Sequence, residues 1–182
     1  MPILYYFLPR KLSIFLMFLT ALTFLIVDFL RLHINPVKSI FIILFGSLLR
    51  KREFTSLTGG SYLMLASLVN MLIFEDRGIF MASIAFLAVG DTMAALIGLT
   101  HGKTKIFTLK KTLEGMIACF LSCTLISYIL SILPNINLPL KIGLIGAAIA
   151  TIIEVLPLEV NDNVLIPLVS AIGMQIFKAI LP

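Results

Sequence analysis

The stretch Gly90–Gly115, GDTMAALIGLTHGKTKIFTLKKTLEG, joins an apolar segment to a basic loop. Asp91 stands at its start among Ala, Ile, Leu and Met residues. An acidic side chain inside a membrane-spanning segment is costly and usually functional. The loop that follows carries glycines and lysines and closes at Lys111–Gly115. Such a loop beside a carboxylate is what a polyanion such as a nucleotide needs, so we expect the functional site here.

The composition indicates an integral membrane protein. Of 182 residues, 60% are hydrophobic and 13% charged, with a mean hydropathy of +1.12, whereas soluble domains are roughly 45–50% apolar and about 25% charged. We expect one all-α transmembrane bundle over residues 1–182. The net charge is +5, but Lys and Arg sit in short loops between apolar runs, which indicates orientation and phosphate contacts rather than nucleic-acid binding. Cys119 and Cys123 are expected to be packing residues, because no His or third Cys lies nearby.

Six segments are expected to span the membrane: Leu12–Leu30, Ser61–Phe74, Ile79–Leu99, Leu113–Leu133, Leu140–Leu156 and Val164–Leu181. The first holds about nineteen residues, which cross a ~30 Å core at about 1.5 Å per residue. Pro36–Leu49 is shorter and is expected to lie on the membrane surface; if it crosses, there are seven spans.

The positive-inside rule places one set of loops in the cytoplasm. With Pro36–Leu49 on the surface, these loops hold most of the basic residues: Arg31, Lys38, Arg50–Arg52, Lys103, Lys105, Lys110 and Lys111. The rule does not separate six spans from seven. Six are favoured, because only then do Asp28 and Arg31 share a face of the membrane with the basic loop.

Asp91 is expected on a helix face with the small residues Ala94, Ala95 and Gly98, which allow another helix to approach. It would lie about 12 Å below the helix end at Leu99, where a carboxylate needs a cation, a proton or water. Mg²⁺ held together with phosphate oxygens would suit it. A protonated or ion-paired structural Asp is the alternative.

Glu154 mirrors Asp91. Its helix face carries small residues as well, namely Gly146, Ala147 and Ala150, so we expect the two faces to pack close together. A polar cluster follows it: Glu159, Asn161, Asp162 and Asn163. One alternative for this cluster is a turn in which Asp162 is the N-cap of the last helix, and such a cap is compatible with a metal or nucleotide role.

The loop His101–Gly115 is not a P-loop. Only three residues separate Gly98 from Gly102, one fewer than that motif needs, and no strand precedes them. Its lysines and the helix N-terminus at Thr112 can still hold phosphate. Glu114 in the first turn can cap the helix or help to hold a metal. An orientation signal alone is the alternative.

Asp28 and Arg31 are three residues apart at the end of the first span and hence share a face. They are either a capping ion pair at the membrane surface or an acid and a base directed at a polar headgroup. For the basic cluster that begins at Arg50 and includes Glu53, the alternative is a solvated loop.

These motifs together resemble the dolichol kinase, phytol kinase and CTP-dependent diacylglycerol kinase family of membrane lipid kinases. The resemblance rests on an ordered set along most of the chain: Asp28–Arg31, Arg50 with Glu53, Gly59 with Tyr62, Gly90–Thr92 with Ala94, Ala95 and Gly98, Gly102–Lys103, Lys111–Gly115, and Asp162–Asn163 with Pro167. Met1–Pro9 looks like the end of a further span that the family often has, so either the chain starts upstream or this is a shorter member.

The resemblance implies transfer of the γ-phosphate of CTP to the hydroxyl of a membrane lipid alcohol, with Mg²⁺ as cofactor and a site on the cytoplasmic side. The implied catalytic residues are Asp91, Lys111, Glu114 and Asp162, of which Asp91, Glu114 and Asp162 would hold metal. The implied nucleotide-binding residues are Gly102, Lys103, Lys110, Lys111, Thr112, Gly115 and Asn163. The implied headgroup residues are Asp28, Arg31, Arg50 and Glu53.

Two other functions stay open at this point. A cytidylyltransferase that makes a CDP-lipid from phosphatidate needs the same CTP, metal and lipid. A small transporter or proton relay could use Asp91 and Glu154, but it predicts charged groups on both faces of the membrane, whereas the loops here concentrate charge on one. The acceptor alcohol and the oligomeric state are not determined by the sequence.

Overall fold

The computed structural model describes residues 2–106, 111–157 and 160–181, and these residues are almost entirely helical. The helices are α1 (Pro2–Phe7), α2 (Arg10–His33), α3 (Asn35–Phe45), α4 (Gly59–Ile73), α5 (Arg77–Ala85), α6 (Thr92–His101), α7 (Leu113–Ile132), α8 (Leu140–Val155) and α9 (Asp162–Ile180). Two short 3₁₀ turns, η1 (Gly46–Leu48) and η2 (Lys51–Phe54), follow α3, and a π-helical segment, η3 (Phe86–Asp91), joins α5 to α6. In the described part of the chain the expected all-α class is confirmed.

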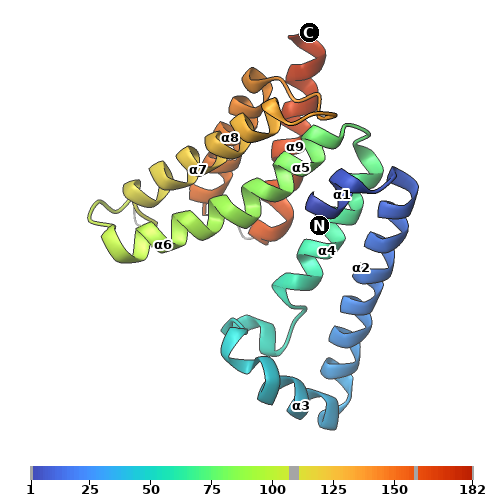
Figure 1. Ribbon diagram of the computed structural model, residues 1–182. Helices are drawn as coiled ribbons and strands as arrows, with labels where there is room; N and C mark the ends of the chain where they lie inside the picture. The colour runs from blue at the N-terminus through green and yellow to red at the C-terminus, as the bar shows by residue number, and fades with distance from the viewer. Residues whose placement is uncertain (1, 107–110, 158–159, 182) are drawn as a thin grey trace.

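The helices form two groups that meet along α4 and α9 (Figure 1). In one group α2 packs against α4, and α3 turns back from the end of α2. In the other, α5, η3 and α6 run on as one long helix, against which α7, α8 and α9 pack. The α3 region and the α6–α7 region therefore face each other from different groups (Figure 1).

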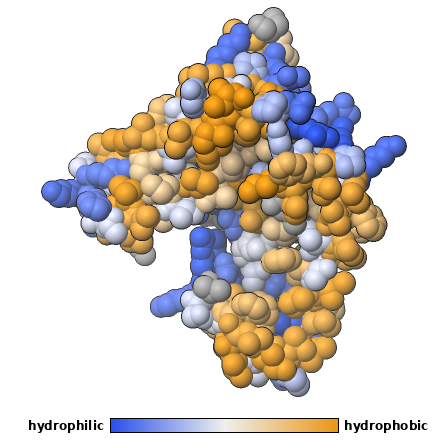
Figure 2. Space-filling model, in the orientation of Figure 1, coloured by the Kyte–Doolittle hydropathy of each residue, from blue (hydrophilic) through white to orange (hydrophobic). Residues whose placement is uncertain are grey.

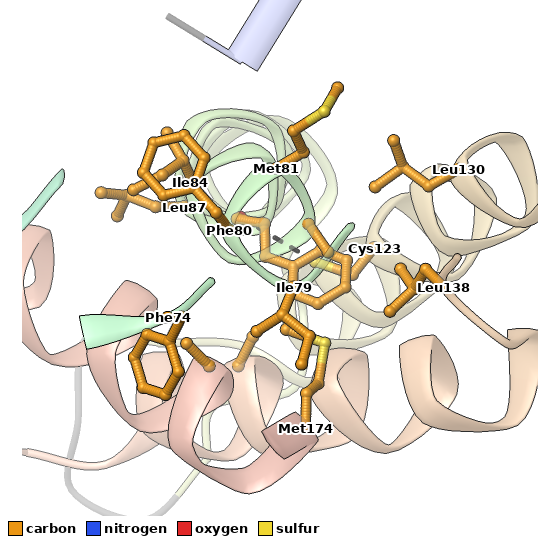
Figure 3. Close-up of a cluster of buried hydrophobic side chains, with 14 of the residues drawn as sticks. Phe74, Ile79, Phe80, Met81, Ile84, Leu87, Cys123, Leu130, Leu138 and Met174 are labelled. Atoms are coloured by element: carbon orange, nitrogen blue, oxygen red, sulfur yellow. Dashed lines mark hydrogen bonds between the residues drawn. The ribbon is translucent and has the colours of Figure 1, made fainter. Parts of the chain in front are cut away.

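The core is centred on α5. Seven of its nine residues are buried, in the run Gly78–Ile84. Their side chains point in several directions and meet residues of α7, α9 and the α7–α8 connection, such as Leu130, Leu138 and Met174 (Figure 3). A helix that is apolar on all sides is expected to be enclosed by other helices, and α5 fits that rule.

Four helical segments are long and apolar enough to cross a membrane: Arg10–His33, Arg77–His101, Leu113–Ile132 and Asp162–Ile180. They match four of the six expected spans, and the protein is thereby indicated to be integral to the membrane. The other two correspond to α4 with 15 residues and α8 with 16, which reach only about 23 Å at 1.5 Å per residue against a core of ~30 Å. The expected count of six or seven spans is therefore not confirmed.

The short segment after α2 is a separate helix. The structure places α3 over Asn35–Phe45, eleven residues with none fully buried. Pro36 is the second residue of this helix. In the first turn a backbone N–H has no partner within the helix, so the N–H that proline lacks costs nothing there. Apolar side chains cover much of the visible surface in both groups of helices (Figure 2), as expected for a protein whose surroundings are lipid.

Candidate functional site

A cavity of about 310 Å³ lies where the second helix group faces the loop after α3, and we call it the polar cavity. It is lined by Arg50, Asp91, Ala94, Ala95, Gly98, Leu99, Lys111, Thr112, Gly115, Met116, Glu154, Val155 and Asp162. In Figure 2 a notch lies between the α3 region and the α6–α7 region, with hydrophilic residues along its edge. Three carboxylates and two basic side chains thus converge from distant parts of the chain.

Asp91 reaches this cavity from the end of the π-helical segment. The segment widens the turn just before Asp91, and such π-helical turns inside α-helices often occur at functional sites. Ala94, Ala95 and Gly98 line the same cavity, as expected from their shared helix face. Asp91 is half-buried and makes no side-chain hydrogen bond or ion pair with the described residues.

Lys111 links the two other carboxylates of the cavity. Its ammonium donates to Oε1 of Glu154 at 2.9 Å and to the Glu154 carbonyl oxygen. It also lies 4.0 Å from Oδ2 of Asp162. Glu154 is only 6% exposed, and its Oε2 is buried without a hydrogen-bond partner. The last turn of α8 and the first turn of α9 are therefore held to the loop before α7 by one lysine.

The start of α9 differs in one detail from the expected cap. The N-cap is Asn161, whose side chain accepts a hydrogen bond from the Asn163 backbone N–H at 3.1 Å. Asp162 is instead the first residue of the helix. The alternative in which Asp162 caps this helix is wrong by one residue, because Asn161 is the residue with the extended backbone that a cap needs. Asp162 is thereby left to face the polar cavity.

Two backbone hydrogen bonds join the described ends of the basic loop just before α7. Ile106 N–H donates to Lys111 O at 2.9 Å, and Leu113 N–H donates to Thr104 O at 2.9 Å. Thr112 caps α7 by accepting from the Gly115 backbone N–H at 3.2 Å. These bonds fix the direction in which Lys111 leaves the loop.

Glu114 stabilises the described ends of the same loop. Its two carboxylate oxygens accept from the Thr104 backbone N–H at 3.1 and 3.3 Å. It does not line the polar cavity. Lys103 is exposed and lines neither cavity described here. Lys110 and Glu159 lie outside the described residues.

The glycines of the motif allow α6 and α7 to approach closely. A Cβ on Gly115 would lie 2.7 Å from the Ala94 carbonyl oxygen of α6, and one on Gly102 would lie 2.6 Å from Thr112 Cγ2, next to α7, as well as 2.2 Å from the Gly98 carbonyl oxygen. Real Cβ atoms do not come so close to backbone. Gly98 and Gly115 also line the polar cavity, whereas Gly102 packs against Thr112 outside it.

A second cavity, of about 570 Å³, lies beside the first, and we call it the apolar cavity. It is lined by Thr23, Phe24, Val27, Asp28, Phe41, Phe45, Leu49, Arg50, Glu53, Thr58, Gly59, Gly60, Leu63 and Asn163. The surface that these residues present to the cavity is mostly apolar, and the polar side chains come from α2, from the segment between α3 and α4 and from the start of α9. An apolar volume with a few convergent polar groups is the usual form of a small-molecule site.

Asp28 and Arg31 form a buried clamp on the segment before α4. Arg31 Nε donates to Asp28 Oδ1 at 2.8 Å, and both side chains are 2% exposed. The other nitrogens of Arg31 donate to the carbonyl oxygens of Glu53 at 2.8 Å and Ser56 at 2.7 Å. Asp28 Oδ2 accepts from the Thr58 backbone N–H at 2.7 Å, from Thr58 Oγ1 and from Ser61 Oγ. The guanidinium of Arg31 donates only to protein acceptors here, so this pair holds a wall of the apolar cavity in place.

Glu53 and Asn163 extend that wall. Glu53 accepts from the backbone N–H groups of Arg50 at 3.3 Å and Gly59 at 3.2 Å. Asn163 Nδ2 donates to the Gly59 carbonyl oxygen at 2.9 Å. Glu53 thus fixes the turn that presents Arg50, and Asn163 ties the start of α9 to the start of α4.

Arg50 lines both cavities. Asp162 lines the polar cavity, and the next residue, Asn163, lines the apolar one. The two cavities therefore adjoin, with the exposed guanidinium of Arg50 between them. Sequence reasoning placed Arg50 with the headgroup residues, and its position against the polar cavity as well depends on the packing of α4 on α9.

The donors present fit a divalent cation shared with phosphate. No group of three or more His, Cys, Asp or Glu in the described ranges is arranged to hold a metal ion. Mg²⁺, however, takes one or two carboxylates and completes its shell with water and phosphate oxygens. Asp91 and Asp162, two of the three expected ligands, line the polar cavity. Glu154, which was not among the expected ligands, adds a buried oxygen without a partner.

Comparisons with known proteins give distant relatives. The chain is 27% identical to an uncharacterized protein of Rickettsia prowazekii over 99% of this chain and 89% of that protein. It is 32% identical to an uncharacterized protein of Methanocaldococcus jannaschii over 66% of this chain and 60% of that protein. It is 26% identical to CTP-dependent diacylglycerol kinase 1 of Eremothecium gossypii over 83% of this chain. The chain spans about half of that kinase, 54% of its length. No family model and no solved structure matches. The similarity to the kinase suggests a lipid kinase.

Proposed function

We propose that this protein is a CTP-dependent kinase of the membrane that transfers the γ-phosphate of CTP to the hydroxyl of a lipid alcohol. The observation that carries the proposal is the adjoining pair of cavities with Arg50 lining both. The apolar cavity suits the lipid, and the polar cavity suits the charged triphosphate. A phosphoryl group bound at Arg50 would be within reach of the lipid in the apolar cavity and of the triphosphate in the polar cavity.

In this proposal the lipid hydroxyl oxygen forms a bond to the γ-phosphorus while the bond from that phosphorus to the β–γ bridging oxygen breaks, and CDP leaves. The hydroxyl proton passes to Asp91, which makes no hydrogen bond or ion pair with the described residues. Lys111 and Arg50 neutralise phosphate oxygens. Mg²⁺, held by carboxylates of the polar cavity, would supply further charge neutralisation. Phosphoryl transfer requires mainly such positioning and neutralisation.

The chain's own residues also shape the acceptor site. Glu53 and Asn163 line the apolar cavity next to Arg50 and are the polar groups that orient a headgroup. Arg31 acts through the segment that it holds, and Asp28 holds the same segment while also lining the apolar cavity. The proposal places this site on the cytoplasmic side, where CTP is present.

The test is a labelling experiment on the full chain in nanodiscs. Two preparations of CTP are used, one labelled at the γ-phosphate and one in the cytosine ring, with ATP labelled at the γ-phosphate for comparison. The acceptors are diacylglycerol, a twenty-carbon isoprenoid alcohol, dolichol and phosphatidate. The proposal expects γ-label on a lipid alcohol, no ring label on any lipid, and loss of transfer in Asp91→Asn. Ring label on phosphatidate would instead establish a cytidylyltransferase.

A further inference from the structure

The polar cavity has too much negative charge to accept a triphosphate by itself. Three carboxylates line it, from Asp91, Glu154 and Asp162, against the two cations of Arg50 and Lys111. A nucleoside triphosphate is itself strongly anionic. Like charges at short range repel by several kcal/mol at an effective dielectric constant of about 20, so the ligand must enter with an additional cation.

Glu154 is the carboxylate that most needs that cation. It is 6% exposed, and Oε2 is buried with no hydrogen-bond partner among the described groups. A buried charged oxygen left unpaired costs free energy. Its other oxygen is bound by the Lys111 ammonium at 2.9 Å. The carboxylate is thus half-satisfied, and the unsatisfied half belongs to a residue that lines the cavity.

Lys111 occupies the position that a metal ion would take between two carboxylates. Its ammonium lies 2.9 Å from Oε1 of Glu154 and 4.0 Å from Oδ2 of Asp162. The lysine side chain lines the polar cavity and is 32% exposed, so an anion in that cavity can reach it. A carboxylate pair that shares one ammonium is close enough to share one divalent ion after a small side-chain movement.

We propose that Glu154 and Asp162 form a divalent-cation site in the polar cavity, and that Lys111 fills this site in the protein without nucleotide. When a metal-bound triphosphate enters, the metal takes the two carboxylates and the Lys111 ammonium turns to the phosphate oxygens. This inference rests on the proposed function for the identity of the triphosphate, but the cation site itself does not depend on it. In this arrangement Lys111 neutralises the two carboxylates between turnovers, and the metal binds more tightly when the anion that Lys111 then contacts is present.

The experiment measures Mn²⁺ binding to the full chain in nanodiscs by electron paramagnetic resonance, with and without CTP. The wild-type protein should bind Mn²⁺ weakly alone and at least tenfold more tightly with CTP. Lys111→Met removes the competing ammonium at similar length and should bind Mn²⁺ at least tenfold more tightly than the wild type without CTP. Adding Glu154→Gln to Lys111→Met should abolish that gain.

Lys11→Met is the matched control, because Lys11 is exposed on α2 and lines neither cavity. It should leave Mn²⁺ affinity unchanged in all conditions. If Lys111→Met does not fold, Lys111→Gln gives the same test, since it also lacks the ammonium. Equal Mn²⁺ affinity of the wild type and the Lys111 variant, or a gain that survives Glu154→Gln, would overturn the inference.

The outcomes separate this inference from the proposed function. A Mn²⁺ site revealed by Lys111→Met and lost with Glu154→Gln, in a protein that transfers no phosphate from CTP, would support the cation site and contradict the kinase. Phosphate transfer by the wild type without any Mn²⁺ gain in Lys111→Met would support the kinase and contradict the role given to Lys111 and Glu154.

Discussion

Replacing Asp28 by Asn should loosen the segment that walls the apolar cavity. The two oxygens of Asp28 have different partners: Oδ1 accepts from Arg31 at 2.8 Å, and Oδ2 accepts from Thr58 N–H at 2.7 Å and Ser61 Oγ at 2.6 Å. Asn has only one acceptor oxygen, and its NH₂ group cannot accept a hydrogen bond, so this group must face the donors on one of the two sides. Either Arg31 or the Thr58–Ser61 side loses its acceptor.

The magnitude follows from the burial of the pair. Both side chains are 2% exposed, and removing one partner of a buried ion pair costs about 3–5 kcal/mol. For a chain of this length each kcal/mol lowers Tm by roughly 2–4 °C. We therefore expect Asp28→Asn to lower Tm by roughly 6–20 °C. Because the clamp holds the backbone at Glu53 and Ser56, and Glu53 fixes the turn that presents Arg50 to both cavities, the KM for the lipid alcohol and the KM for CTP should both rise.

The assay is thermal unfolding of the purified protein in detergent, followed by lipid titration of the variants that stay folded. Ser61→Ala is the graded control, since it removes one hydrogen bond of Asp28 and should cost only about 1 kcal/mol. The double variant Asp28→Asn with Arg31→Met removes both charges and should be more stable than the sum of the single changes predicts. A Tm within about 2 °C of the wild type for Asp28→Asn, or strict additivity in the double variant, would refute the reasoning.

Three further changes test the packing and the assignment of the cavities. Gly115→Ala places a Cβ 2.7 Å from a backbone oxygen of α6 and should lower the free energy of unfolding by about 1–3 kcal/mol. Its control, Gly46→Ala, meets only a side-chain methyl at 3.2 Å and should lower that free energy by less. Equal losses of stability in the two variants would contradict the close approach of α6 and α7. Val27→Phe should narrow the apolar cavity and raise the KM for the lipid several-fold without changing that for CTP, with Val69→Phe, exposed on α4 and outside the cavity, as the control that should change neither. Asn70→Ala removes two buried hydrogen bonds of 3.0 and 3.1 Å and should destabilise by about 1–3 kcal/mol; an unchanged Tm would show that these bonds contribute nothing.

The site could be predicted where it depends on local spacing. Asp91, Ala94, Ala95 and Gly98 were expected on one helix face, and all four line the polar cavity. A face of this kind needs only the helical repeat, which the sequence contains. The π-helical segment that ends at Asp91 could not be predicted from the helical repeat. Its wider turn depends on the packing of η3 against α7, α8 and α9.

Pairings between distant residues could not be predicted. The sequence indicated a face of small residues on the helix of Glu154. The contact of Glu154 with Lys111, however, depends on how α8 and α9 are positioned relative to α7. The clamp of Arg31 on the carbonyl oxygens of Glu53 and Ser56 has the same character. Backbone carbonyl acceptors are present at every residue, so a sequence carries no mark of which one an arginine will meet.

The sequence by itself therefore determined that this protein lies in a membrane, that it is helical and that Asp91 is close to the basic loop. The reason is that the length of apolar segments and helical periodicity are local properties of the chain. The tertiary structure alone decided that the described residues enclose the polar cavity beside the apolar cavity, that Arg50 lines both, and that Lys111 lies between Glu154 and Asp162. These depend on the relative placement of helices that are far apart in the chain, which side-chain packing fixes and residue spacing does not encode.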